Sequence, residues 1–457
     1  MLRADSLADL LGGRLEAAPG ARLEITDLVS DSRRVTPGAG FVALPGEAMD
    51  GHAFVADAAR RGGALAVVGE AFQPGPEAPP LLIRVPDTGV ALRAACSRRI
   101  SQLGATVVGV TGSVGKTTAK EMCALALAGR PTARTPGNLN TWTQIPLYVL
   151  RLEPPVERLV VEMAMTAPGE IADLAGFTHP TYGVLLNVGQ AHIGRLGSEE
   201  AIAQAKAELL AALPPDGAAI LNADDPRVFG VAALSRAPVR WFGEESPEAA
   251  WRVEDVAADG VLGIRAVISG PDGRAPIRLR APGRHLLLDA AAAAAVASCF
   301  GVGIAEAAER IGEFAPAEHR GELMSGLQGS ILVDDSYNSS PTSLAAALEV
   351  LRVSGAPERL AIIGDMLELG DHTLAAHREA GRHVAEAATR LIAVGEHAEV
   401  VAGAALAAGM PAAAVAQAAD ADGAAELALP LLGPGTVVLV KGSRGIGLDR
   451  VVERLLA

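Results

Sequence analysis

Short apolar runs alternate with longer amphipathic stretches along most of this chain. Runs of about five apolar residues predict buried strands, and the stretches between them predict helices. Because strands that alternate with helices favour a parallel sheet covered by helices, the pattern predicts an α/β fold. The expected strands are 41–44, 64–68, 105–110, 159–163, 182–187, 218–221, 331–333, 360–363, 391–394 and 437–440. The expected helices are 54–61, 199–213, 341–351, 374–388 and 448–456.

The pattern also divides the 457 residues into three expected domains, in line with about 150 residues for each domain. Residues 239–279 predict an antiparallel extension of the second domain, with turns at Asp259–Gly260 and Asp272–Gly273. The expected domains are a small N-terminal α/β domain at 1–104, a central parallel-sheet domain at 105–312 and a C-terminal Rossmann-like α/β domain at 313–457.

Composition narrows the kind of protein further. The net charge of −14 argues against a nucleic-acid-binding protein, because phosphate contacts need a basic surface. Three cysteines, Cys96, Cys123 and Cys299, fit no disulfide or zinc spacing and suit a reducing compartment. The N-terminus has no signal-peptide pattern, and the longest apolar stretch, 286–300, contains Asp289 and is too short to span a bilayer. We therefore expect a soluble cytoplasmic protein that binds no nucleic acid and enters no membrane.

A glycine-rich segment, Gly109–Thr118, lies between a predicted strand and a helix-like stretch. Glycines let backbone N–H groups approach phosphate oxygens, and a helix N-terminus adds a favourable field. Lys116 would reach the outer phosphates of a nucleotide, and the Thr117 hydroxyl would ligate magnesium. The usual pattern has glycine where this chain has Val110, so the segment is a variant P-loop, and a glycine turn before a buried helix is the alternative. The expected phosphate-binding residues are Gly112, Ser113, Val114, Gly115, Lys116, Thr117 and Thr118.

Two polar residues follow neighbouring predicted strands of the central domain. Glu162 ends one apolar run, where a buried carboxylate is costly unless a cation compensates it. His192 comes just after the next strand, and the carboxyl ends of parallel strands meet beside the phosphate loop. Both residues are therefore candidates for a metal site near Thr117, with ordinary strand-end or hydrogen-bonded structural roles as the alternatives. Lys206, on the predicted helix 199–213, would by itself be interpreted as a solvated lysine.

A polar loop, Asp334–Pro341, follows a predicted strand of the third domain. It combines two acids with hydroxyl and amide groups, which makes it a candidate functional loop. The alternative interpretation is an ordinary capped strand–helix turn. Arg320 lies near the junction of the second and third domains, where a guanidinium could reach a phosphate or ribose.

Together these motifs resemble the Mur ligase family of bacterial cell-wall synthesis over essentially the whole chain. Three stretches resemble the branch of the family that adds D-alanyl-D-alanine: 334–341, 364–370 and 441–444. The other matching stretches are 30–38, 50–54, 111–118, 137–140, 187–192 and 222–225.

The resemblance implies an ATP-dependent ligase of peptidoglycan precursor synthesis. In this family a substrate carboxylate attacks the γ-phosphate of ATP to give an acyl phosphate, and an amine then displaces phosphate. The implied substrates are UDP-N-acetylmuramoyl-tripeptide and D-alanyl-D-alanine, with ATP and two magnesium ions, and a monomer is expected. The alternatives are a sister ligase that adds a different amino acid, a nucleotide-dependent switch protein and an inactive scaffold.

The resemblance also assigns roles to individual residues. Thr117 and Glu162 would hold one magnesium, and His192 would serve the second together with Lys206, which matches the lysine that is carbamylated in the family. The expected catalytic residues are Lys116, Glu162, His192, Lys206 and Arg320. Further expected contacts are Arg320, Asp335 and Asn338 with the nucleotide, Ser30 and Arg33 with the UDP-sugar, and Asn138 and Asn140 near the reacting peptide. Leu286 and Asp289 stand where the family commonly has asparagines, so the sequence does not predict how adenine is recognised.

Overall fold

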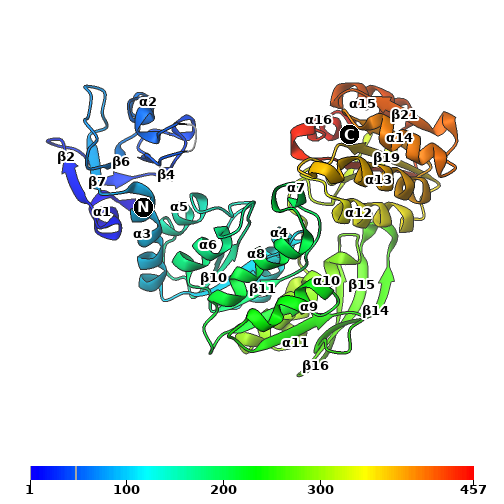
Figure 1. The fold of residues 1–457 in the computed structure, drawn as a ribbon, viewed down its shortest axis with the longest axis horizontal. Helices are drawn as coiled ribbons and strands as arrows, with labels where there is room; N and C mark the ends of the chain where they lie inside the picture. Colours follow the sequence, from blue (N-terminus) through cyan, green and yellow to red (C-terminus); the bar gives the residue numbers. More distant parts are fainter. Residues whose placement is uncertain (1, 47–48) are drawn as a thin grey trace. The chain divides into compact units, whose positions relative to one another are not determined.

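The computed structural model describes residues 2–46 and 49–457, which form two compact units (Figure 1). The first unit contains the described residues up to Gly109 together with Arg130–Ala164 and Glu170–Thr181. The second unit contains Val110–Gly129, Met165–Gly169 and Tyr182–Ala457. The three-domain boundaries expected from the sequence stay predictions.

A five-stranded sheet in the first unit has the order β2-β7-β6-β5-β4, with β2 antiparallel to β7 and the other pairs parallel. Alternate side chains of these strands pack in two separate cores, as a period of two requires. Val67 and Ile83 pack against α1 and α3, whereas Ala66 and Leu82 pack in the other core. The bounds are α1 Ala4–Leu11, β2 Arg14–Ala17, β4 Leu28–Val29, β5 Gly40–Val42, α2 Val55–Arg60, β6 Leu65–Gly69, β7 Leu81–Val85 and α3 Thr88–Leu103.

The largest sheet has nine strands in the order β16-β15-β14-β13-β12-β11-β8-β10-β9. Its strands are β8 Thr106–Thr111, β9 Thr132–Arg134, β10 Arg158–Glu162, β11 Tyr182–Leu185, β12 Ala218–Asn222, β13 Val239–Gly243, β14 Trp251–Ala258, β15 Ile264–Gly270 and β16 Gly273–Leu279. The associated helices are α4 Lys116–Ala126, α5 Gln144–Leu150, α6 Glu170–Thr178, α7 Ile193–Leu196, α8 Glu199–Ala212, α9 Pro226–Val231, α10 His285–Cys299 and α11 Ile304–Ile311.

The predicted antiparallel extension at 239–279 is wrong in its first part. β13 pairs parallel to β12, and β14 pairs parallel to β13. α9 lies between β12 and β13 and returns the chain to the same end of the sheet, which makes the β12–β13 pair parallel. Only β14, β15 and β16 pair antiparallel, across the predicted turns at Asp259–Gly260 and Asp272–Gly273.

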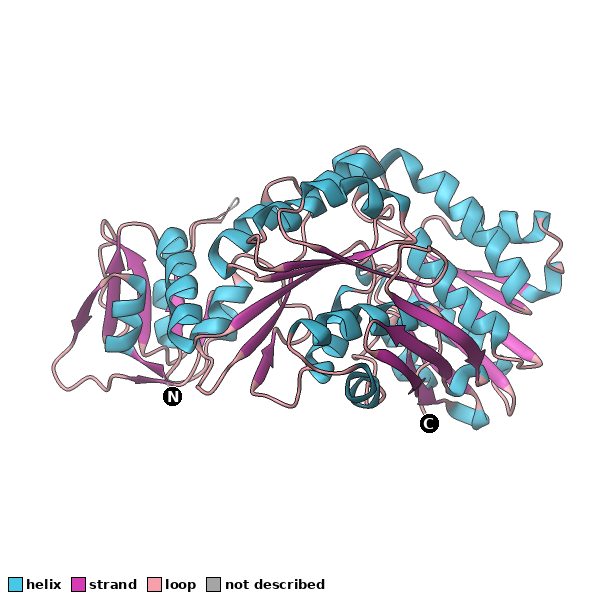
Figure 2. Cartoon of the chain, turned by 90° about the horizontal axis from the view of Figure 1, so that it is seen from below, coloured by secondary structure: helices cyan, strands magenta, loops and turns pink. Residues whose placement is uncertain are grey.

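A six-stranded sheet, β17-β18-β22-β19-β20-β21, is parallel except for β17, and its elements follow β16 and α11 in the chain. Figure 2 distinguishes its strands from the helices that alternate with them. The bounds are β17 Glu322–Ser325, β18 Ile331–Asp334, α12 Pro341–Val353, β19 Glu358–Gly364, α13 Thr373–Ala387, β20 Arg390–Val394, α14 Ala398–Ala407, β21 Val415–Ala418, α15 Ala421–Ala428, β22 Thr436–Lys441 and α16 Asp449–Leu455.

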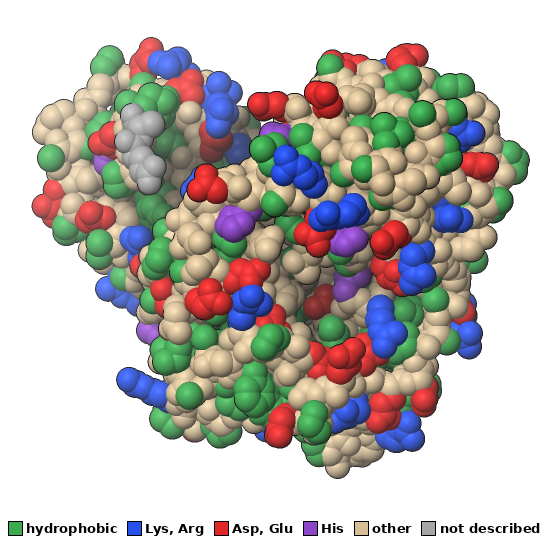
Figure 3. Space-filling model, turned by 45° about the vertical axis from the view of Figure 1, so that its right-hand side comes forward, with side chains coloured by type: hydrophobic (Ala, Val, Ile, Leu, Met, Phe, Trp, Pro, Cys, Tyr) green, Lys and Arg blue, Asp and Glu red, His purple; other side chains and the backbone are tan. Residues whose placement is uncertain are grey.

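The predicted α/β fold is confirmed, with parallel strands forming the centre of each large sheet. Over the described part of the chain, every helix is too short or too polar to cross a membrane. On the face shown in Figure 3, acidic and basic side chains are intermixed rather than gathered by sign.

Candidate functional site

The loop between β8 and α4 has the backbone geometry of a phosphate cradle. Gly115 immediately precedes α4 with φ 86°, a left-handed conformation that glycine adopts without strain. A Cβ at Gly115 would lie 3.0 Å from Oδ1 of Asp289, so the neighbouring side chain also requires glycine. Thr117 is buried in the first turn of α4, where helix N–H groups lack intrahelical acceptors. The predicted cradle, 112–118, is therefore built at a helix N-terminus.

The segment after β11 holds this cradle in place. Val114 N–H donates to Oδ1 of Asn187 (2.9 Å), and Nδ2 of Asn187 donates to the Val114 carbonyl (3.0 Å). Gly189 N–H donates to Oγ of Ser113 (2.8 Å). The sequence places Asn187 in the matching stretch 187–192 but gives it no role of its own. Its position at the end of an apolar run is the feature that indicates one.

Two lysine side chains meet at one backbone oxygen of the cradle. Nζ of Lys116 donates to the Gly112 carbonyl at 2.8 Å, and Nζ of Lys206 donates to the same oxygen at 3.0 Å. Lys206 is 2% exposed on α8, so its interpretation as a solvated lysine is wrong. Burial, and then the charge of Lys116, lower the pKa of Lys206 well below its usual value. Lys206 therefore becomes a neutral amine at a lower pH than a surface lysine does.

Lysine occurs only four times in the sequence, and none of the four side chains is exposed. Lys116 is half-buried, and Lys120, Lys206 and Lys441 are buried. Nearly all surface positive charge thus comes from arginine.

His192 is in the same neighbourhood as the two cradle lysines. It lies just before α7 with φ 65°, and its Nδ1 is 2.6 Å from Oε2 of Glu368. Burial lowers the pKa of His192, Glu368 opposes this shift through charge and a hydrogen bond, and Lys116 and Lys206 lower the pKa further. Gly189, three residues before His192, donates its N–H to Oγ of Ser113, so His192 follows the segment that holds the cradle. Glu368 was not predicted as a site residue.

Glu162 is buried at the end of β10, in the first unit. Nδ2 of Asn140 donates to its Oε1 (2.9 Å), and Oγ1 of Thr135 accepts from its backbone N–H (3.1 Å). Asn140, expected near the reacting peptide, thus contacts the Glu162 carboxylate directly, and its contact with substrate stays a prediction. A metal shared by Glu162 and Thr117 stays a prediction.

The residues expected to hold the nucleotide from the third domain gather at the ends of β18 and β22. These strands pair in parallel with Asp334 opposite Val440, which brings the next residues, Asp335 and Lys441, together. Nζ of Lys441 donates to Oδ2 of Asp335 (2.6 Å) and to the carbonyl of Asn338 (2.9 Å). Burial raises the pKa of Asp335, although the charge and hydrogen bond of Lys441 act in the opposite direction.

Arg320 is fixed by an aromatic ring of the same loop. Its guanidinium carbon lies 3.9 Å from the ring centre of Tyr337, and that of Arg444 lies 5.3 Å from the same ring. Beside them, Nδ1 of His319 is 2.7 Å from Oδ2 of Asp334. The expected contact of Arg320 with the nucleotide stays a prediction, and the sequence gave no role to Arg444 or Lys441.

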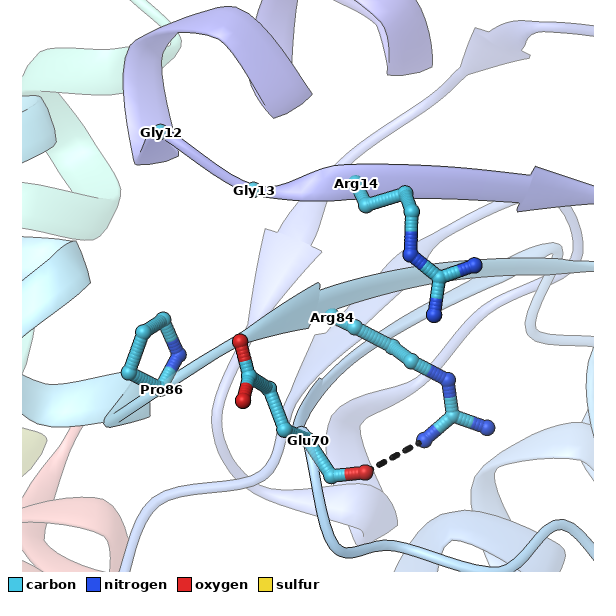
Figure 4. Close-up of a pocket in the computed structure, with 6 residues that line it drawn as sticks. All are labelled: Gly12, Gly13, Arg14, Glu70, Arg84 and Pro86. Atoms are coloured by element: carbon cyan, nitrogen blue, oxygen red, sulfur yellow. Dashed lines mark hydrogen bonds between the residues drawn. The ribbon is translucent and has the colours of Figure 1, made fainter.

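The residues expected to bind the UDP-sugar belong to the first unit, whereas the cradle belongs to the second. Ser30 follows β4, and the exposed Arg33 bonds Asp31 through Nε (2.9 Å) and Nη2 (2.8 Å). Asn138 is exposed. A separate cavity of about 540 Å³, lined by none of these residues, is shown in Figure 4, where Nη1 of Arg84 donates to the Glu70 carbonyl. The lining residues are Gly12, Gly13, Arg14, Glu70, Arg84 and Pro86.

Asp289, one of the two residues that depart from the family pattern expected near adenine, lies on α10. Asp289 is buried on α10 against Gly115, and burial raises the pKa of its carboxyl well above the usual value. Burial, and then the charge of Lys441, lower the pKa of His285 to about 4. Burial thus favours the neutral forms of both Asp289 and His285, which lie in the first turns of α10.

Comparisons with known proteins cover most of the chain. The Mur ligase middle domain matches residues 110–297, the glutamate ligase domain of Mur ligases matches 319–444, and the catalytic domain of the Mur ligase family matches 24–99. The UDP-N-acetylmuramoyl-tripeptide–D-alanyl-D-alanine ligase of Mycobacterium tuberculosis (strain ATCC 25618 / H37Rv) is 36% identical, with 99% of this chain and 97% of that protein covered. The ligase of the same name from Bacillus subtilis (strain 168) is 30% identical over the same shares.

Solved MurF structures are also similar to this chain over nearly its whole length. A crystal structure of MurF from Acinetobacter baumannii superposes with a TM-score of 0.87 at 28% identity, covering 99% of this chain and 98% of that one. The MurF ligase from Thermotoga maritima in complex with ADP superposes with a TM-score of 0.80 at 27% identity, covering 94% and 96%.

Proposed function

The chain belongs to the Mur ligase family, and from this premise we propose that it joins D-alanyl-D-alanine to UDP-N-acetylmuramoyl-tripeptide while converting ATP to ADP and phosphate. The relatives of that name match it from end to end, and so do the MurF structures. The reaction belongs to the synthesis of peptidoglycan precursors. The observation that carries the proposal is the meeting of Lys116 and Lys206 at the Gly112 carbonyl of the cradle.

The cradle fits a nucleotide triphosphate in three respects. Gly115 leaves the backbone open, α4 directs its first N–H groups toward the loop, and Lys116 supplies an amine that lies against the loop's own carbonyls. We assign the outer phosphates to Lys116 and the helix N-terminus. Arg320, Asp335 and Asn338 would hold the same nucleotide from the β18–β22 edge, with Lys441 keeping Asp335 in position.

Divalent magnesium fits the donor set, because hydroxyl, carboxylate and imidazole groups are all offered near the cradle or at β10. Thr117 and Glu162 would hold one ion, and His192 with a modified Lys206 would hold the second. When bound, the ions neutralise charge on the phosphates and on the reacting carboxylate.

Lys206 is suited to carbamylation by its surroundings. A neutral amine adds carbon dioxide and releases a proton, leaving a carbamate with carboxylate-like oxygens. The buried Lys206, next to the charge of Lys116, favours the neutral amine. We propose that the carbamate of Lys206 is the form that binds metal.

The UDP-sugar substrate would bind to residues of the first unit, and ATP would bind to the cradle. Ser30 and Arg33 are proposed to contact the UDP-sugar, and Asn138 and Asn140 the peptide end that reacts. Asn140 is already bonded to Glu162, which links peptide binding to a proposed metal ligand.

The test is release of phosphate from ATP with UDP-N-acetylmuramoyl-tripeptide, with and without D-alanyl-D-alanine. Release that needs both substrates, with the pentapeptide product identified by mass, is expected. Lys116→Ala should abolish it, whereas Arg352→Ala, on the exposed surface of α12, should not change it.

Other outcomes would redirect the assignment. Release with a dipeptide-sugar and a single amino acid would contradict the D-alanyl-D-alanine assignment in favour of a sister ligase. ATP binding without release for any acceptor would contradict ligase activity.

A further inference from the structure

The segment that carries Glu368 rests directly on the segment that carries His192. Gly194 N–H donates to the Glu368 carbonyl at 3.2 Å. A Cβ on Gly194 would lie 2.7 Å from the Gly370 nitrogen and 2.8 Å from the Glu368 oxygen, closer than real Cβ atoms come. The two backbones therefore touch, and only glycine at 194 permits this contact.

The side chains across this contact are charged and complementary. Oε2 of Glu368 is 2.6 Å from Nδ1 of His192, and Oε1 is 3.7 Å from Nη2 of Arg195. Both His192 and Glu368 have φ 65°, in the left-handed region that non-glycine residues rarely adopt. The Glu368 carboxylate with its two partners, and the backbone bond from Gly194, link these two positions.

The hydrogen bond decides which ring nitrogen of His192 is available. When Nδ1 is protonated and donates a hydrogen bond to Glu368, Nε2 keeps its lone pair. A carboxylate in this position also makes the ring a stronger ligand, as metal-binding histidines in general show. Gly189, three residues earlier in the chain, donates its N–H to Oγ of Ser113 (2.8 Å), which places the segment that carries His192 beside the cradle.

We propose that Glu368 is a positioning residue, which accepts a hydrogen bond from the Nδ1–H of His192. Nε2 is thereby fixed as the atom that binds a divalent cation. The inference rests on the proposed function, which makes His192 a metal ligand. Glu368 belongs to the stretch that matches the glutamate ligase domain, and His192 to the middle domain. The metal ligand is thus oriented only while these two segments are in contact.

The first experiment measures the tautomer of His192 by nitrogen NMR of histidine-labelled protein without metal or nucleotide. His192→Gln identifies the signal. The Nδ1–H tautomer is expected to dominate in the wild type and in Glu368→Gln, whose amide oxygen still accepts the proton. In Glu368→Ala the Nε2–H tautomer should appear. Glu379→Gln is the matched control, because Glu379 is exposed on α13 and lies 3.9 Å from His383.

The second experiment measures manganese affinity by electron paramagnetic resonance, with a non-hydrolysable ATP analogue present. Glu368→Ala should weaken binding at the His192 site by about tenfold, as losses of such supporting carboxylates do. Glu368→Gln should retain most of the affinity. If Glu368→Gln binds as poorly as Glu368→Ala, Glu368 is itself a ligand and the positioning role is overturned.

These outcomes separate the inference from the proposed function. An unchanged tautomer in Glu368→Ala overturns the inference, whichever reaction the protein catalyses. A protein that joins a different amino acid but shows the tautomer shift and the weaker manganese binding supports it. Circular dichroism of each variant verifies folding, and Glu368→Gln, which keeps the shape of the side chain, provides the comparison if Glu368→Ala does not fold.

Discussion

At the scale of single residues, charge and burial act together on the cradle. The Gly112 carbonyl accepts from two amines, and both cannot be fully charged without repelling each other. Lys206 is the more buried of the two, so it is the amine that gives up its proton more readily. This favours the neutral amine at Lys206, the form that the proposed carbamylation requires.

Lys206 should carry a carbamate that depends on dissolved carbon dioxide. Labelled bicarbonate is expected to give a carbamate signal by carbon NMR in the wild type and in Lys441→Ala, but not in Lys206→Ala. Activity of Lys206→Ala should fall by at least about a hundredfold, because a group that stabilises reacting charge is lost. A carbamate signal that survives in Lys206→Ala would assign the modification elsewhere.

His319 should contribute stability that depends on pH. Burial disfavours its charged form, but the hydrogen bond and charge of Asp334, with Glu318 and Asp449, outweigh it and raise the pKa of His319. The folded protein therefore holds this proton more tightly than the unfolded chain, whose histidine titrates near about pH 6.5. The stabilisation is complete below that pH and is lost as pH rises through the higher folded value.

His319→Asn tests this, because asparagine tolerates the φ of 63° at this position. The difference in free energy of unfolding from the wild type should be largest in acid and shrink by up to about 1 kcal/mol toward alkaline pH. Denaturant titrations at several pH values measure it. Parallel pH profiles for the two proteins would contradict the expectation.

At the scale of elements, the site is made of strand ends and helix starts. The sequence predicted most of these because apolar runs end at polar residues, as at Glu162 and Asp334. It did not give Lys441 a role, because only the parallel register of β18 and β22 brings it to Asp335. Glu368 was equally inaccessible, since its partner is 176 residues away. α14 and α15 were missed because alanine gives little contrast between buried and exposed faces.

The N-cap of α8 should matter because this helix carries Lys206. Ser198 is this cap, with its Oγ accepting from Ala201 N–H at 3.1 Å. Ser198→Ala should lower the free energy of unfolding by about 1 kcal/mol, and Ser198→Asp, another good cap, should not. Denaturant unfolding of the three proteins measures the effect. Equal loss in both variants would assign the hydroxyl a role other than capping.

At the scale of the whole molecule, the chain divides into two units, and hydrophobic clusters of buried residues lie within each of them. The cradle, Lys206, His192 and the β18–β22 edge all belong to the second unit. A nucleotide that binds only the folded state should therefore protect that unit first. The proposed UDP-sugar contacts, Ser30 and Arg33, belong to the other unit.

Hydrogen exchange should reveal this difference. At about a hundred times its dissociation constant, ADP with magnesium should add about 2.7 kcal/mol of protection to α4 and α8. The cores around α1 and α3 should change much less. Lys116→Ala should remove the effect at the same concentration. Equal protection of both units would mean that the chain unfolds as one cooperative body.

The scarcity of lysine gives this protein an unusual chemical surface. Because Lys116 is half-buried and the other three lysines are buried, reagents that acylate amines meet no exposed lysine side chain on the described residues. Lys116 is then the most accessible lysine, and a bound nucleotide would cover it. Acylation of Lys116, followed by mass spectrometry, would therefore report occupancy of the cradle directly, whereas lysine cross-linking would reveal little about the molecule's outer contacts.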